Sequence, residues 1–111
     1  MALNEAEITD VKQCMESFMK KRRPPAFVRD EVDLQYRIIG NEVIISRVNY
    51  INNKKYESPI AKIVLNRPHT SWNLYSIVKP NQWIAAIKVS IPSFSDAIKV
   101  VENDVSRCFF G

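Results

Sequence analysis

Apolar residues near the start of the chain recur at three- and four-residue intervals, which is the spacing of one buried face of an α-helix. The residues on this face are Ile8, Val11, Met15, Phe18 and Met19, with Cys14 beside them. Asn4 followed by Glu7 forms a capping-box pattern, which predicts where the helix begins. Pro24 and Pro25 disfavour helical backbone in the residues before them, so we expect the helix to end there.

The middle of the chain changes to alternating apolar and polar residues, which is the two-residue period of a β-strand. The first strand places on its inward face Val32, Leu34, Tyr36 and Ile38. Further strands are expected over about residues 42–50, 57–66, 71–79 and 82–91, the fourth strand with one face made of Trp72, Leu74, Ser76 and Val78. Gly40-Asn41 and Pro80-Asn81 predict turns, and residues 51–56 a polar loop. Pro59 indicates an edge position or the start of a strand.

A second helix is predicted after Ser93, which has the acidic residue Asp96 three positions later. Its buried stripe would consist of Phe94, Ala97, Ile98 and Val101. The order of elements therefore predicts a single α+β domain over residues 1–111. We expect two layers, with an antiparallel meander sheet of four or five strands and an N-terminal and a C-terminal helix on one face.

The later strands carry apolar residues at both parities, as in Val43-Ile44-Ile45. A sheet with one face in water should not show this pattern. Either the sheet curls and buries part of its second face, or a second copy of the chain covers that face. Large apolar patches are rarely left exposed, and symmetric dimers are the commonest assemblies, so we expect a homo-oligomer.

Composition and charge describe an ordinary globular protein: of 111 residues, 46% are hydrophobic and 25% are charged. The net charge of +4 allows an anionic partner but is lower than that of a dedicated nucleic-acid binder. No segment approaches the roughly 18 apolar residues that span a bilayer, and the acidic start of the chain is unlike a signal peptide. We therefore expect a cytoplasmic protein without a membrane partner. Cys14 and Cys108 are expected to be free thiols.

Residues for catalysis are few. A nucleophilic Cys–His pair could be formed by Cys108 with the single histidine, His69. We expect instead that His69 is a turn residue and that Cys108 packs in the fold. The acidic cluster of Asp30, Glu31 and Asp33 is expected to be a solvated face. The glycines are too few for a phosphate-binding loop, and the spacing of His and Cys is not that of a zinc site. We therefore predict no catalytic, cofactor-binding or metal-binding residues.

The densest positive charge closes the first helix. With cations farther along the chain, it defines a candidate surface for an anion or a partner: Lys20, Lys21, Arg22, Arg23, Arg29, Arg37 and Arg47. Cations at the C-terminus of a helix are also simply compatible with the helix dipole. The alternative is that they bind phosphate groups while aromatic residues on the strands stack against bases. The neighbouring acidic cluster would weaken such a field.

Several sequence blocks resemble a family of small bacterial proteins of unknown function. The blocks are Arg22-Arg23-Pro24-Pro25, Arg29-Asp30, Leu34-Gln35-Tyr36-Arg37-Ile38, Ser58-Pro59-Ile60-Ala61-Lys62, Trp72-Asn73-Leu74-Tyr75, Trp83 and Cys108-Phe109-Phe110-Gly111. The resemblance implies a bacterial, cytoplasmic, single-domain protein of a kind also found in mobile gene cassettes, and it supplies no activity or cofactor. Because two exposed phenylalanines would promote aggregation, we expect the last block to dock on the core.

These observations favour a non-enzymatic interaction or binding module that forms homodimers. The first alternative is a nucleic-acid-binding accessory protein that uses the basic junction from Lys20 to Arg23. The second is an enzyme of unrecognised type, built from Cys108, His69 and the acidic cluster.

Overall fold

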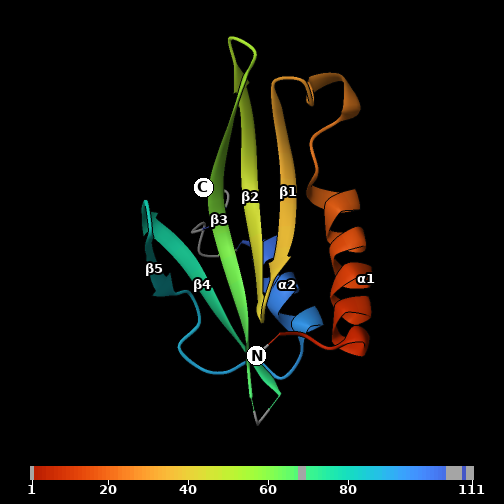
Figure 1. Cartoon of the computed structure of the whole chain (residues 1–111), viewed down its shortest axis with the longest axis vertical. Helices are drawn as coiled ribbons and strands as arrows, with labels where there is room; N and C mark the ends of the chain where they lie inside the picture. Colours follow the sequence, from red (N-terminus) through yellow and green to blue (C-terminus); the bar gives the residue numbers. More distant parts are fainter. Residues whose placement is uncertain (1, 68–69, 105–108, 110–111) are drawn as a thin grey trace.

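The computed structural model describes residues 2–67, 70–104 and 109. In this part of the chain, a five-stranded antiparallel sheet in the order β1-β2-β3-β4-β5 lies between two helices in the sequence (Figure 1). The elements are α1 (Glu5–Arg22), the short 3₁₀ helix η1 (Ala26–Val28), β1 (Val32–Ile39), β2 (Glu42–Ile51), β3 (Lys54–Asn66), β4 (Ser71–Lys79), β5 (Gln82–Ala85) and α2 (Phe94–Asn103). The predicted α+β meander is confirmed.

Both helices begin at the residues predicted from their caps. The Asn4 side chain accepts a hydrogen bond from the Glu7 N–H, and the Glu7 carboxylate accepts one from the Asn4 N–H, both at 2.8 Å. Ser93 accepts a hydrogen bond from the Asp96 N–H at the start of α2. At the other end of α1, Arg23 already has extended backbone, as the following proline requires.

The core lies between one face of the sheet and the two helices. All four residues predicted for the stripe of α2 are buried, as are Val11, Met15 and Phe18 of α1. Across the layers, the rings of Trp72 in β4 and Phe94 in α2 meet edge to face, with centroids 5.1 Å apart. Such a pair contributes about 0.5–1.5 kcal/mol beyond the burial of its area.

The hairpin between β2 and β3 corrects the prediction of a polar loop over residues 51–56. β2 continues to Ile51, β3 begins at Lys54, and only Asn52 and Asn53 form the turn. Both asparagines have positive φ, 53° and 65°, as a type I′ hairpin turn requires. Asparagine adopts this conformation more readily than most residues, so β2 and β3 stay paired as far as the turn. The hairpin projects from one end of the molecule (Figure 1).

The fifth strand is shorter than the predicted range 82–91. β5 ends at Ala85, and the chain returns to the sheet only at Ile91, which bridges to Trp72. Tyr75 pairs with Ala85, and Trp72 pairs with Ile91. Between these two pairs, β4 moves along by three residues, whereas the segment after β5 moves along by six. The surplus residues cannot pair, so the chain bends out of the sheet over residues 86–89.

Two further strand residues differ from expectation. The register between β4 and β5 shifts between Ile77 and Lys79, and Val78 is 54% exposed there, not inward-facing. Pro59 lies inside β3, not at its start. The ladder to β2 shifts register beside it, and the ladder to β4 begins only at Ala61. Pro59 therefore has an edge position within a central strand, and its missing N–H costs no pairing with β4.

The later strands carry apolar residues at both odd and even positions because the outer face of the sheet, away from the helices, is itself partly covered. Ile44 and Val64 are half-buried there, and the Lys62 ammonium lies over the rings of Tyr75 and Trp83, 5.2 and 4.8 Å from their centroids. Neighbouring side chains of the same chain therefore cover part of the second face.

The end of the chain docks on the core at Phe109, which is only 5% exposed. Its N–H donates a hydrogen bond to the carboxylate of Asp104, the left-handed residue that ends α2. The predicted docking is confirmed for Phe109, whereas Cys108, Phe110 and Gly111 lie outside the described residues.

Candidate functional site

The run of cations that closes α1 does not form one continuous surface. Lys21 lies 3.1 Å from the Glu102 carboxylate, and the Arg22 guanidinium donates hydrogen bonds to the Glu102 backbone carbonyl, one of them at 2.8 Å. This carbonyl belongs to the last turn of α2, where helical carbonyls lack partners within the helix. Lys21 and Arg22 therefore fasten the end of α1 to the end of α2.

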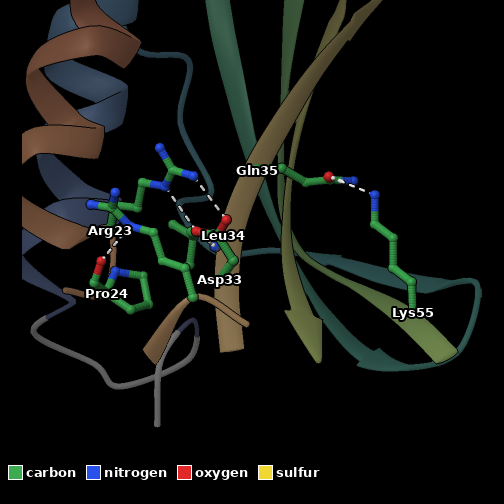
Figure 2. A network of polar contacts seen from close by, with 7 residues as sticks. Arg23, Pro24, Asp33, Leu34, Gln35 and Lys55 are labelled. Carbon is green, nitrogen blue, oxygen red and sulfur yellow. Dashed lines mark hydrogen bonds and ion pairs between the residues drawn. The ribbon is translucent and has the colours of Figure 1, made fainter. Parts of the chain in front are cut away.

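Arg23 points to a different partner, Asp33 at the start of β1. Its Nε and Nη2 donate to the two carboxylate oxygens at 2.8 and 2.9 Å, and Asp33 also accepts the Leu34 N–H at 2.7 Å. Figure 2 shows Arg23 reaching Asp33 from the end of α1, while Gln35 on the same strand points away toward Lys55. The hydrogen bonds from Arg23 lower the pKa of Asp33 despite its partial burial. The pair closes the junction between helix and strand.

The other predicted cations lie on separate parts of the molecule. Arg37 forms a two-bond ion pair with Glu57 on the outer face of the sheet, at 3.2 and 2.8 Å. Burial would raise the pKa of Glu57, but its polar neighbours, the Gln35 amide and the Arg37 guanidinium, outweigh burial and lower that pKa. Arg47 pairs in register with Leu34, so it lies on the core side of β2.

Three of the predicted cations do come together, in a groove between α1 and β1. This groove has a volume of about 530 Å³ and is lined by Lys12, Glu16, Met19, Lys20, Arg23, Arg29 and Tyr36. Lys12 was missed in the sequence, although the spacing of residues 12, 16, 19, 20 and 23 places them on one side of a helix. Arg29 is held in place by a 2.8 Å hydrogen bond from its Nε to the Pro24 carbonyl.

Positive charge dominates the groove, because four cations face the single carboxylate of Glu16 among its lining residues. Arg23 is neutralised by Asp33, but Lys12 and Lys20 form no ion pair within the described part of the chain. Both lysines are exposed. Met19 and the Tyr36 ring give the groove an apolar component. The arrangement can hold an anion without moving an existing ion pair.

Nucleophilic chemistry has little support in the described residues. Cys14 is half-buried, and burial together with the nearby Asp10 raises the pKa of its thiol, so it stays protonated at neutral pH. His69 and Cys108 lie outside the described residues, so the expectation of a turn histidine and a packing cysteine stays a prediction. Asp30 and Glu31 are exposed, whereas Asp33 is bound to Arg23.

Among residues 2–67, 70–104 and 109, no group of three or more His, Cys, Asp or Glu side chains is arranged to hold a metal ion. In the same residues, no helix has the length and apolar character needed to cross a membrane.

Comparison with known proteins identifies the family. No curated protein and no solved structure matches the chain. Residues 3–111 match the family model described as a domain of unknown function, DUF3024. This match covers nearly the entire sequence, so the chain belongs to the DUF3024 family.

Proposed function

We propose that the protein is a non-enzymatic binding module whose ligand is anionic and whose binding site is the groove between α1 and β1. The observation that carries the proposal is the convergence of Lys12 and Lys20, both without an ion pair in the described chain, with Arg23 and Arg29 around a hollow of about 530 Å³. A concave surface lined by one sign of charge concentrates ligands of the opposite sign. The volume lies in the usual range of ligand sites.

The nucleic-acid alternative placed its binding site on the run from Lys20 to Arg23. Lys21 and Arg23 form ion pairs with Glu102 and Asp33, and Arg22 donates hydrogen bonds to the Glu102 backbone carbonyl. Of the four cations, only Lys20 has no such contact recorded in the described chain. A phosphate backbone that bound this run would have to compete with those contacts. The geometry therefore supports a local anionic ligand in the groove better than a nucleic acid along the junction.

The test is a pair of double variants titrated with a fluorescein-labelled hexaglutamate peptide at low salt, followed by fluorescence anisotropy. Lys12→Ala/Lys20→Ala should weaken binding at least tenfold, since loss of two charged contacts costs more than about 1.4 kcal/mol. Lys54→Ala/Lys88→Ala removes the same charge from exposed sites outside the groove and should stay within about twofold of the wild type. Equal affinities for the two variants would refute the assignment of the groove.

A second candidate property is self-association through the outer face of the sheet. Ile39 and Tyr50 remain 54% and 39% exposed on this face, beside the Arg37–Glu57 ion pair. A two-fold axis sets a surface patch against its own copy, so that apolar residues and opposite charges of this face can meet across the axis. This supports the outer face as the contact surface of the homodimer that we propose. The bacterial origin, the cytoplasmic location and the occurrence in gene cassettes stay predictions of the resemblance.

A further inference from the structure

Within residues 2–67, 70–104 and 109, the first strand of the sheet has one open edge, because β1 pairs only with β2. In an antiparallel ladder, the backbone groups of alternate residues face the partner strand. The Tyr50 N–H donates to the Glu31 carbonyl at 2.9 Å, so Glu31 and every second residue after it face β2. The N–H and C=O groups of Leu34, Tyr36 and Ile38 therefore point away from β2.

Two hydrogen bonds agree with this assignment and limit the open edge. The Leu34 N–H is occupied by the Asp33 carboxylate, and the Gly40 carbonyl accepts the Leu3 N–H at 3.0 Å. Between these points, the structure records no hydrogen bond within the described chain to the Leu34 carbonyl or to the backbone groups of Tyr36 and Ile38 that face outward. The open edge thus runs over about five residues, or roughly 16 Å of strand.

This open edge and the basic groove occupy the same place in the fold. Figure 1 shows α1 beside β1 at the margin of the sheet, and Tyr36 of the open edge lines the groove. Lys12 and Lys20 line the groove from α1, and Tyr36 lines it from β1, between Leu34 and Ile38 on the same open edge. A phosphate ion or a carboxylate could neutralise the lysines but would leave the backbone groups unpaired.

We propose that the groove binds an extended acidic peptide that adds to β1 as a further strand. The proposal rests on the groove being the ligand site, and it specifies the ligand. The peptide backbone pairs with Leu34, Tyr36 and Ile38, as in recognition by strand addition at a sheet edge. Its carboxylates face the lysines of α1.

The spacing of the lysines defines the peptide pattern. Lys12 and Lys20 are eight residues apart, or about 12 Å along a helix. Two side chains on the same face of a strand, four residues apart, are separated by about 13 Å. Acidic residues at positions i and i+4 of the peptide thus match the two lysines. The residue at i+2 faces Glu16 and should be neutral.

Two other occupants fit the groove less well. In a single-stranded nucleic acid, the phosphates that the lysines attract only accept hydrogen bonds, so these groups cannot pair with the open carbonyls of β1. A second copy of the chain, joined edge to edge through β1, would bring two sets of Lys12 and Lys20 together, and juxtaposed like charges oppose association. An acidic peptide satisfies both the lysines and the open edge of β1.

The experiment uses the labelled peptide acetyl-Thr-Glu-Val-Thr-Val-Glu-Thr-amide and two forms of it, each N-methylated at one alternate set of amides. Because only one set faces β1, one methylated form should lose at least tenfold in affinity and the other should bind like the parent. Amide hydrogen exchange on the ¹⁵N-labelled protein gives the second readout. Saturating parent peptide should slow exchange at Tyr36 and Ile38 at least tenfold. The Arg37 N–H already faces β2 and should not change.

The outcomes separate this proposal from the one on which it rests. Binding that depends on Lys12 and Lys20, but with equal affinity for both methylated forms and no protection of Tyr36, overturns strand addition and leaves the anionic site standing. No binding of either this peptide or hexaglutamate overturns both. Lysine-dependent binding of a single-stranded oligonucleotide but not of the peptide overturns the peptide in favour of nucleic acid. Protection of Tyr36 at high protein concentration without peptide overturns it in favour of a second copy.

Discussion

The docking of Phe109 makes a prediction about stability. Its ring is 5% exposed, and its N–H is bound to Asp104 at the end of α2. Phe109 is thus a member of the core, although it follows the last helix. Replacing it with alanine should destabilise the whole fold rather than release a loose end.

The size of the effect follows from the buried area. A phenylalanine side chain buries at least about 150 Å², which at about 25 cal/mol per Å² corresponds to nearly 4 kcal/mol. Alanine keeps one methyl group, worth about 0.8 kcal/mol, so roughly 3 kcal/mol is lost before any cavity is counted. Measured Phe→Ala changes in cores are about 3–5 kcal/mol. At about 4 °C per kcal/mol for a domain of this size, Tm should fall by about 12 °C.

The assay is urea unfolding followed by far-ultraviolet circular dichroism for the wild type, Phe109→Ala and the control Phe27→Ala. Phe27 is 83% exposed in η1, so the same substitution there should change the unfolding free energy by less than about 0.5 kcal/mol. If Phe109→Ala lost less than 1 kcal/mol, or no more than Phe27→Ala, the docking of this residue would be refuted.

Two further predictions concern acid and self-association. Hydrogen bonds from Arg23 lower the pKa of Asp33 in the folded state, so its stabilising contribution is complete above the unfolded pKa of about 3.9 and is lost as the pH falls through the folded pKa. Asp33→Asn should therefore be less stable at pH 7 but lose less stability than the wild type between about pH 5 and pH 2, measured as urea midpoints; parallel pH profiles would contradict this. Multi-angle light scattering should give twice the chain mass of 12.8 kDa, and Ile39→Lys should shift it to the monomer. A monomeric wild type at high concentration would rule out the dimer.

Features encoded within a few residues could be predicted from the sequence. The cap formed by Asn4 and Glu7, the end of α1 before Pro24 and the turn at Gly40 depend on local backbone preferences and nearby hydrogen bonds. The stripe of α2 follows from helical periodicity, because the spacing alone decides which side chains share a face.

Features that depend on the neighbouring strand could not be predicted. The exposure of Val78 follows from a register shift between β4 and β5, and the bend over residues 86–89 follows from where the chain must rejoin β4. Pro59 is tolerated inside β3 because the hydrogen-bonded ladder between β3 and β4 begins only at Ala61. The register between two strands also depends on how each strand pairs with its other neighbour, and no local sequence pattern specifies that register.

The basic junction shows the same division in the candidate site. The sequence by itself determined that Lys20 to Arg23 close a helix, and that prolines follow. Successive helical residues point about 100° apart, so cations adjacent in the sequence face different neighbours. Only the tertiary structure placed Glu102 beside Lys21 and Arg22, 80 residues from Arg22 in the sequence, and set the open edge of β1 beside Lys12 and Lys20. Periodicity is a local property of the chain, whereas the partner of each charge depends on how the helices and the sheet pack.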